Sequence, residues 1–209
     1  MKKIILTITA CSVLFLNACK TTIEEPKGFP FKLAQNSKIK WKGKAADGNF
    51  NEGFIDVKGN ANAEGFDFDV VDKEIRGGEF TIPVSSIDVT NLPPHLKPVL
   101  EEHLKTADFF YMITHPNVTF KITSAKPITP SSVEHNYQVT GQMTLLGQTH
   151  PLTFPAAVFI SADRLTIKAN FTFNQSLWGM NYHIDPSYPA NDRLVKGIEV
   201  SFDLVANAK

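Results

Sequence analysis

The stretch from Glu101 to Phe120 reads Glu-Glu-His-Leu-Lys-Thr-Ala-Asp-Phe-Phe-Tyr-Met-Ile-Thr-His-Pro-Asn-Val-Thr-Phe. It begins with helical spacing of apolar side chains and breaks at the adjacent rings Phe109 and Phe110. It then turns through Pro116 and ends in the alternating pattern of a strand. With the residues before it, the stretch predicts a short amphipathic helix over 94–104, whose apolar side must cover another part of the fold.

Outside this stretch, most segments between residues 37 and 207 alternate apolar and polar side chains with period two. The clearest example runs from Leu165 to Phe173. Short turn sequences such as 147–148 separate the segments. The pattern predicts an all-β chain, a meander of about eight antiparallel strands with one apolar face each. Because an open meander leaves strand edges unpaired, closure into a barrel is favoured.

The first eighteen residues have the features of a secretion signal, a basic start followed by an apolar run too short to span a bilayer stably. They end in Leu16-Asn17-Ala18-Cys19, which resembles the lipobox of bacterial lipoproteins. That resemblance implies cleavage before Cys19 and acylation of Cys19, which would anchor the chain in a membrane. The alternative is an ordinary secretion signal with a chance cysteine. We expect a signal peptide over 1–18, a lipidated N-terminus and tether over 19–36 and one barrel domain over 37–207.

The residue after the cysteine bears on location. Lys20 differs from the Asp that resembles an inner-membrane retention signal in enteric bacteria, which favours an outer-membrane lipoprotein of the cell envelope. Whether the domain faces the periplasm or the cell surface stays open, as does a homodimer.

Cysteine and charge content exclude several functions. The chain has two cysteines, Cys11 and Cys19, and neither would remain as a free thiol in the mature domain. A thiol nucleophile, a redox pair and a cysteine metal site are therefore excluded. Lys2 and Lys3 are two of the 21 basic residues, so the mature chain keeps 19 against 21 acidic ones. Without a basic patch, we expect no nucleic-acid partner.

Catalytic motifs are also missing from the sequence. It contains no nucleophile elbow, His-Glu-x-x-His, P-loop or dinucleotide-binding pattern. His183, Asp185 and Asp192 have the side chains of an oxygen-rich metal site, but such a trio is more often a solvated loop. We therefore predict that the protein is not an enzyme, with no catalytic residue, no metal and no cofactor other than a bound lipid.

The aromatic composition bears on what the barrel encloses. The chain has 16 Phe against 4 Tyr and 2 Trp. Phenylalanine adds volume without a polar group that needs a partner. A barrel of about eight strands can fill its interior with side chains or hold one elongated ligand. Composition leaves both readings open, and a filled core is the simpler one.

Three spaced motifs resemble the YceI-like family. The segments 102–110 and 115–120 resemble its signature, Ser85–Thr90 resembles a strand end upstream, and Val139–Thr149 resembles a hairpin downstream. The resemblance covers about residues 37–207. It implies a lipocalin-like, up-and-down barrel that binds a polyisoprenoid lipid in an elongated central pocket. Tyr111 stands where the family commonly has Asp, so the resemblance leaves the identity of the ligand open.

An apolar tunnel can bind such a lipid without a designed polar site, because burying one isoprene unit contributes roughly 3–4 kcal/mol. Selectivity would then come from polar side chains at the opening, for which His103, His183 and Arg193 are the candidates. The alternative is a structural or interaction lipoprotein with a filled barrel. The predicted ligand-contacting residues, most of them on inward strand faces, are Phe80, Ile82, Phe109, Phe110, Phe120, Val139, Met143, Phe154, Phe171, Phe173, Trp178 and Phe202.

Overall fold

The computed structural model describes residues 28–63, 65 and 67–209. The predicted signal peptide and the predicted lipidation site therefore lie outside the described residues. The strands are β1 (Phe29–Leu33), β2 (Lys38–Ala45), β3 (Phe50–Asp56), β4 (Lys58–Gly59), β5 (Phe68–Val71), β6 (Glu74–Arg76), β7 (Glu79–Pro83), β8 (Asp88–Val89), β9 (Asn117–Pro127), β10 (Tyr137–Leu145), β11 (Gln148–Ile160), β12 (Arg164–Asn174) and β13 (Leu194–Ala208). The helices are the 3₁₀ turns η1 (Val84–Ser86) and η2 (Gln175–Trp178) and the α-helix α1 (Lys97–Leu104).

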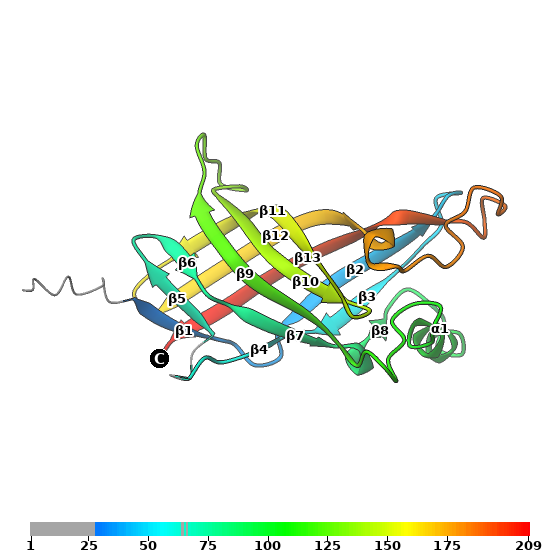
Figure 1. The fold of residues 1–209 in the computed structure, drawn as a ribbon, viewed down its shortest axis with the longest axis horizontal. Helices are drawn as coiled ribbons and strands as arrows, with labels where there is room; N and C mark the ends of the chain where they lie inside the picture. Colours follow the sequence, from blue (N-terminus) through cyan, green and yellow to red (C-terminus); the bar gives the residue numbers. More distant parts are fainter. Residues whose placement is uncertain (1–27, 64, 66) are drawn as a thin grey trace, which may run out of the picture.

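Eight of the strands close into an antiparallel ring. Their order is β1, β5, β6, β9, β10, β11, β12 and β13, and β1 then pairs with β13. Beyond β13 the sheet continues through β2 and β3 to β8, while β7 lies along β9 (Figure 1). The predicted antiparallel barrel of about eight strands with one helix is confirmed.

The strand β1 lies inside the range 19–36 that we assigned to the tether. It completes the ring, since Phe31 pairs with Phe68 on one side and with Ala208 on the other, and its side chain is fully buried. The backbone N–H of Leu33 also donates to Asp67 Oδ2 at 2.8 Å. Because β1 belongs to the ring, the described domain begins earlier than position 37. The sequence did not indicate this strand, since five residues that include a proline are too few to show a clear period-two pattern.

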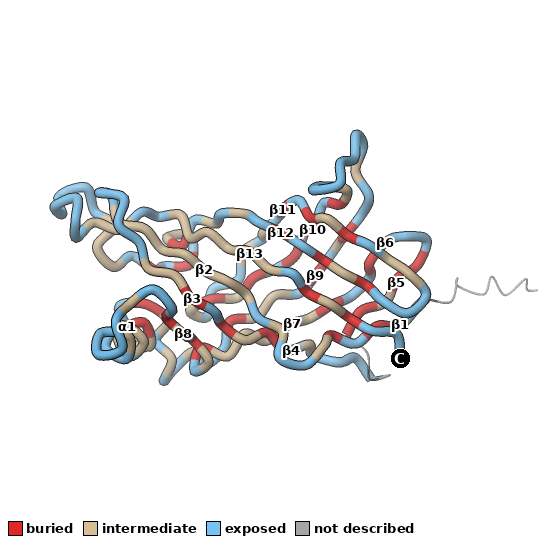
Figure 2. The backbone as a smooth tube through the Cα atoms, turned by 180° about the vertical axis from the view of Figure 1, so that it is seen from behind, coloured by how far each residue is buried: buried red, intermediate tan, exposed pale blue. Residues whose placement is uncertain are grey.

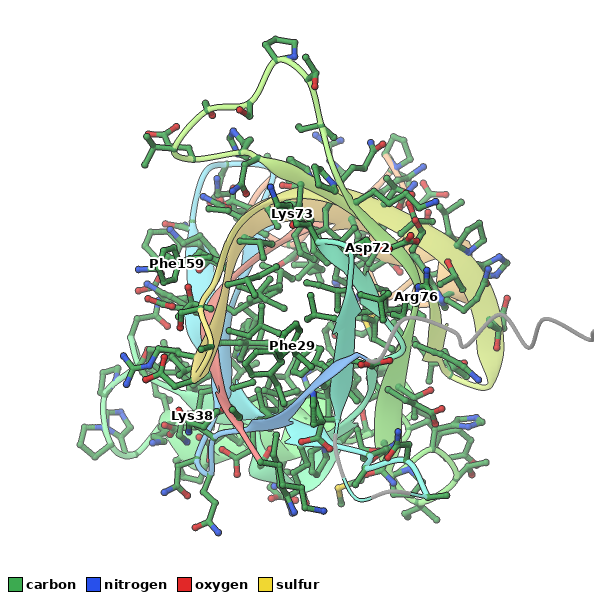
Figure 3. The ribbon with its side chains drawn as sticks, turned by 90° about the vertical axis from the view of Figure 1, so that its left-hand side faces the viewer. Phe29, Lys38, Asp72, Lys73, Arg76 and Phe159 are labelled. Atoms are coloured by element: carbon green, nitrogen blue, oxygen red, sulfur yellow. The ribbon has the colours of Figure 1, made fainter. Side chains whose placement is uncertain are left out.

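Alternation determines which side chains point inward. In β12, Leu165, Ile167 and Ala169 are buried, and the polar side chains between them face outward or lie half-buried. Buried positions recur with the same period around the barrel (Figure 2). A view from the end of the barrel where Phe29 lies shows the strands surrounding densely packed side chains (Figure 3).

The helix differs from its prediction at its start. The backbone N–H groups of Leu96 and Lys97 both bond to the carbonyl of Pro93, so the chain makes a turn there and α1 begins at Lys97. Only Leu104 of the helix is buried, and Val99 is 64% exposed. A hydrogen bond joins α1 to β8, because Glu101 Oε1 accepts from the backbone N–H of Val89 at 2.8 Å. No helix among the described residues is long and apolar enough to cross a bilayer.

Candidate functional site

The barrel encloses an inner cavity of about 160 Å³. Its walls come from the inward faces of the strands, and every described side chain that lines it is apolar apart from the indole N–H of Trp41. Such a space offers no set of groups for proton transfer or metal binding. It offers apolar surface to an apolar molecule.

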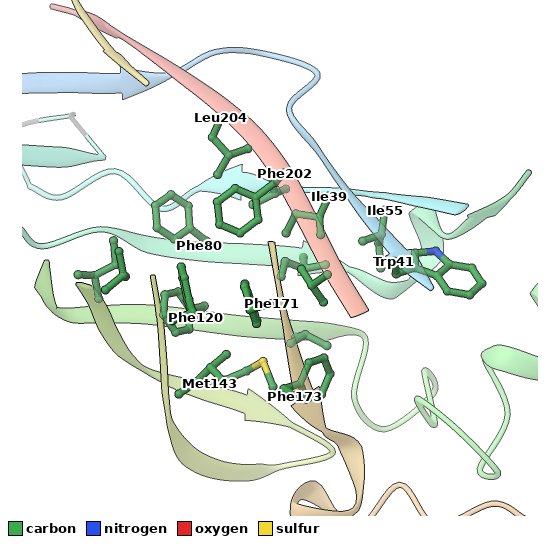
Figure 4. Close-up of a pocket in the computed structure, with 18 of the residues that line it drawn as sticks. Ile39, Trp41, Ile55, Phe80, Phe120, Met143, Phe171, Phe173, Phe202 and Leu204 are labelled. Atoms are coloured by element: carbon green, nitrogen blue, oxygen red, sulfur yellow. The ribbon is translucent and has the colours of Figure 1, made fainter. Parts of the chain in front are cut away.

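Ten of the predicted residues line this cavity, and the close-up labels several of them (Figure 4). They come from strands far apart in the sequence and from the segment after α1. The ten are Phe80, Ile82, Phe110, Phe120, Val139, Met143, Phe154, Phe171, Phe173 and Phe202.

Four phenylalanines, one each from β9, β11, β12 and β13, pack against one another in the cavity wall. The rings of Phe154 and Phe171 stack with their centres 4.2 Å apart and their planes 8° from parallel. Phe202 meets Phe154 edge-on at 6.0 Å, and Phe120 approaches Phe154 at 5.8 Å. Offset and edge-to-face contacts of this kind hold aromatic rings in defined positions. The wall is therefore shaped by interlocked side chains, whose rotation would change the width of the cavity.

A second, outer cavity of about 240 Å³ lies beside α1 and η2. Six residues line both cavities, among them Trp41 and Phe110, so the two spaces share a wall. Phe109 lines the outer cavity alone. Of the two adjacent rings, Phe110 thus borders the barrel interior and Phe109 borders the space outside it.

Polar side chains enter the lining only at the outer cavity. His103 Nε2 lies 2.9 Å from Asp108 Oδ2, and the His103 ring meets Phe109 and Tyr182 edge-on, each at 5.1 Å. Lys44 also lines this cavity and forms an ion pair with Glu199. We predicted an apolar interior with polar groups at its opening. In the structure the inner cavity has the apolar lining, and the outer cavity has the polar side chains.

Only one of the three predicted selectivity residues lines a cavity, and it is His103. The ring of His183 stacks between Tyr182 at 4.0 Å and Tyr188 at 4.1 Å. Arg193 Nη1 donates to a backbone carbonyl of the same loop at 3.1 Å. His183 and Arg193 thus support the loop before β13.

The described residues bring no three His, Cys, Asp or Glu side chains together in a way that could hold a metal ion. Asp185, one of the three residues considered for such a site, accepts a hydrogen bond from the backbone N–H of Ser187 at 2.8 Å. That bond lowers the pKa of Asp185. Its carboxylate therefore serves as a turn-forming group.

Trp178 lies outside the lining of both cavities, unlike the other predicted residues. It is buried at 1% exposure, and its Nε1 donates to the carbonyl of Met143 at 2.9 Å. Its ring meets Phe173 and His150 edge-on. Trp178 thus fastens η2 to β10, and it contacts the cavity lining through the Phe173 ring and the Met143 carbonyl.

Several lining residues were missing from the predicted set. Ile39, Trp41, Ile55 and Ile198 all line the inner cavity. Their signal was the same alternation that identified the phenylalanines, since the first two alternate with lysines in β2.

Comparisons with known proteins agree with this geometry. A model of the YceI-like domain matches residues 32–206. A UPF0312 protein from Ectopseudomonas mendocina (strain ymp) is 32% identical over 99 residues, which are 47% of this chain and 46% of the relative. The match thus spans about half the length of that curated relative.

Two solved structures share the fold. One is BcnA from Burkholderia cenocepacia, with a TM-score of 0.56 and 18% identity over 81% of this chain and 95% of that one. The other is a polyisoprenoid binding domain from Saccharophagus degradans, implicated in plant cell wall breakdown. Its TM-score is 0.58, with 12% identity over 87% of this chain and 99% of that one. At these identities the likeness concerns the fold.

Proposed function

The chain belongs to the YceI-like family, and on that premise we propose that it binds a long isoprenoid lipid in its barrel interior. A polyisoprenoid or an isoprenoid quinone has the required chemistry. The observation that carries the proposal is the inner cavity, which is lined almost entirely by hydrocarbon side chains from around the barrel. The polyisoprenoid binding domain of similar fold is consistent with it.

The size of the site fits a ligand that uses both cavities. The inner cavity, at about 160 Å³, is smaller than the roughly 300–1,000 Å³ typical of ligand pockets. Together with the outer cavity of about 240 Å³ it reaches that range. Each buried isoprene unit contributes roughly 3–4 kcal/mol, against an association cost on the order of 4–15 kcal/mol. A few buried units are therefore enough for binding.

The alternative is a structural or interaction lipoprotein whose barrel is filled by its own side chains. The close stacking of Phe154 on Phe171 favours it, because these rings already fill part of the interior that a lipid would need. The two readings differ in whether the rings move aside for a lipid.

The wider role follows from the ligand. A lipid carrier fits storage or transfer of isoprenoids, or protection of the envelope under stress. The lipobox-like segment ending in Cys19 supports anchoring in a membrane, with the outer membrane favoured by Lys20. The family is one of binding proteins, and we propose a binding role rather than catalysis here.

The test is extraction of the protein after purification without detergent. Organic extracts are analysed by mass spectrometry, and the stripped protein is then offered an isoprenoid quinone. We expect about one prenyl lipid per chain, or stoichiometric uptake of the quinone. Recovery of no prenyl lipid, together with failure to take up quinone, would support the filled barrel instead.

A further inference from the structure

One polar group borders the apolar interior without a partner. The indole Nε1–H of Trp41 in β2 is buried and has no hydrogen-bond partner. The other tryptophan of the chain, Trp178, donates its Nε1–H to a carbonyl. An unpaired buried donor lowers stability, and a phenylalanine at this position would fill space without that cost. The unpaired N–H of Trp41 is therefore a candidate hydrogen-bond donor to a bound ligand.

The position of Trp41 suggests where that role lies. Its side chain lines both the inner and the outer cavity, so it stands where apolar lining gives way to polar lining. In the close-up it lies at the far end of the drawn residues from Leu204 (Figure 4). A lipid with its tail among the phenylalanines would bring its polar end to this wall.

The charges beside this wall limit what the polar end can be. Lys44 is the one lysine or arginine among the described residues that line the outer cavity, and both Lys44 and His103 have acidic partners. Lys44 is paired with Glu199, and His103 lies 2.9 Å from Asp108. Gln175 Nε2 is likewise engaged, with the carbonyl of Val195 at 3.0 Å. A phosphate placed here would find no uncommitted cation, and burying its charge would be costly. A neutral oxygen acceptor meets neither difficulty.

We propose that Trp41 Nε1 donates a hydrogen bond to a neutral carbonyl or hydroxyl oxygen of the bound isoprenoid. The inference rests on the proposed function and adds the chemistry of the ligand's polar end. Because the indole nitrogen is covered by neighbouring side chains, the oxygen displaces them into the space that the two cavities provide. The ligand is thus oriented, with its tail in the inner cavity and its oxygen at the shared wall.

The direct test uses the two indole N–H signals of the nitrogen-15-labelled protein. The probes are an isoprenoid alcohol, a hydrocarbon of equal chain length and the monophosphate of the alcohol. We expect the alcohol to move the Trp41 indole proton downfield, as a new hydrogen bond does, and the hydrocarbon to cause no such shift. The Trp178 signal serves as internal reference because its hydrogen bond is already made.

Affinities give the second test. Replacing Trp41 with Phe should weaken alcohol binding about tenfold, the size of one hydrogen bond. Hydrocarbon binding should change by no more than about twofold. Phe173→Leu, which alters the same wall without removing a donor, should weaken both probes equally.

Three results would overturn the inference while leaving lipid binding intact. They are equal affinity of the native protein for alcohol and hydrocarbon, an unmoved Trp41 signal at saturating alcohol, and tighter binding of the phosphate than of the alcohol. If the native protein binds none of the probes, the proposed function fails as well. Should Trp41→Phe not fold, the signals of the native protein decide alone.

Discussion

At Gly141 the pairing of β10 with β9 shifts register, and the Phe120 ring and the backbone carbonyl oxygen of Lys121 occupy the space that a β-carbon would need. Gly141→Ala should therefore push this ring out of the cavity wall and lower the free energy of unfolding by about 1–3 kcal/mol. Chemical denaturation measures the change. Gly43→Ala is the matched control, because its added carbon would meet Ile198 at an ordinary 3.6 Å. Equal losses in the two variants would contradict this account of the bulge.

Phe171 tests whether the interior opens. Phe171→Trp enlarges a ring stacked at 4.2 Å on Phe154. If the interior takes up lipid, quinone uptake should fall while the melting temperature changes little. In a solidly packed barrel, the added volume should instead cost about 1–3 kcal/mol of stability without affecting uptake. Phe159→Trp is the control, since that ring is 63% exposed on β11.

Among the elements, β1 depends on a buried carboxylate. Asp67 accepts from the backbone N–H of Leu33 at 2.8 Å and is 5% exposed. Asp67→Ala leaves that donor unpaired, so we expect a loss of about 1–3 kcal/mol and faster hydrogen exchange at the Leu33 amide. Asp203→Ala removes a surface partner of Lys168 and should cost about 1 kcal/mol or less. Unchanged protection of Leu33 would mean that strand pairing alone holds β1.

The turn between β5 and β6 is tied to β10 through Tyr137. The hydroxyl of Tyr137 donates to the carbonyl of Lys73 at 2.6 Å, and burial raises the pKa of Tyr137 above its ordinary value. A raised pKa means that folding favours the neutral ring. Its contribution should therefore be complete below about pH 10 and fall as the pH rises through the raised pKa. The free energy of unfolding, measured in alkaline buffers, should fall less steeply with rising pH for Tyr137→Phe than for the native protein. Tyr111→Phe is the control, because that ring is exposed, and it should show the same pH dependence as the native protein.

How far the sequence predicts these elements depends on the length of each alternating run. β12 was predictable because its inward side chains alternate without a break along the strand. β1 was missed because its five residues acquire their place from β5 and β13, which are distant in the chain. The start of α1 was missed because hydrogen bonds to the carbonyl of Pro93 form a turn where helical spacing alone predicted a helix.

In the site, too, strand alternation predicts some residues, while the place of others depends on contacts in three dimensions. Phe120 and Phe154 were predictable as lining residues because the parity of a strand fixes the face of every side chain. Trp178 lies outside the lining of both cavities, and its place was not predictable because it sits in a 3₁₀ turn, where period two gives no information. The unpaired indole of Trp41 could not be foreseen either, since it depends on which groups surround it in three dimensions.

Across the whole molecule, the start of β1 and the helix α1 lie at opposite ends of the barrel (Figure 1). Cys19 precedes Phe29 by ten positions. Ten residues span at most about 35 Å. A lipid on Cys19 would therefore hold the β1 end close to a membrane, while the outer cavity beside α1 faces away from it.

This arrangement predicts that anchoring and ligand binding are separable. Cys19→Ser should move the protein from the membrane fraction to the soluble fraction, because the lipobox resemblance implies that this one residue would carry all the acyl chains. Quinone uptake by the released domain should match that of the native protein, since no described residue before Ile39 lines the inner or the outer cavity. Cys11→Ser, within the predicted signal peptide, should leave fractionation unchanged. Membrane retention of the Cys19→Ser protein after removal of residues 1–18 would show that the barrel surface itself, with exposed apolar side chains such as Val99 and Ile113, supplies the attachment.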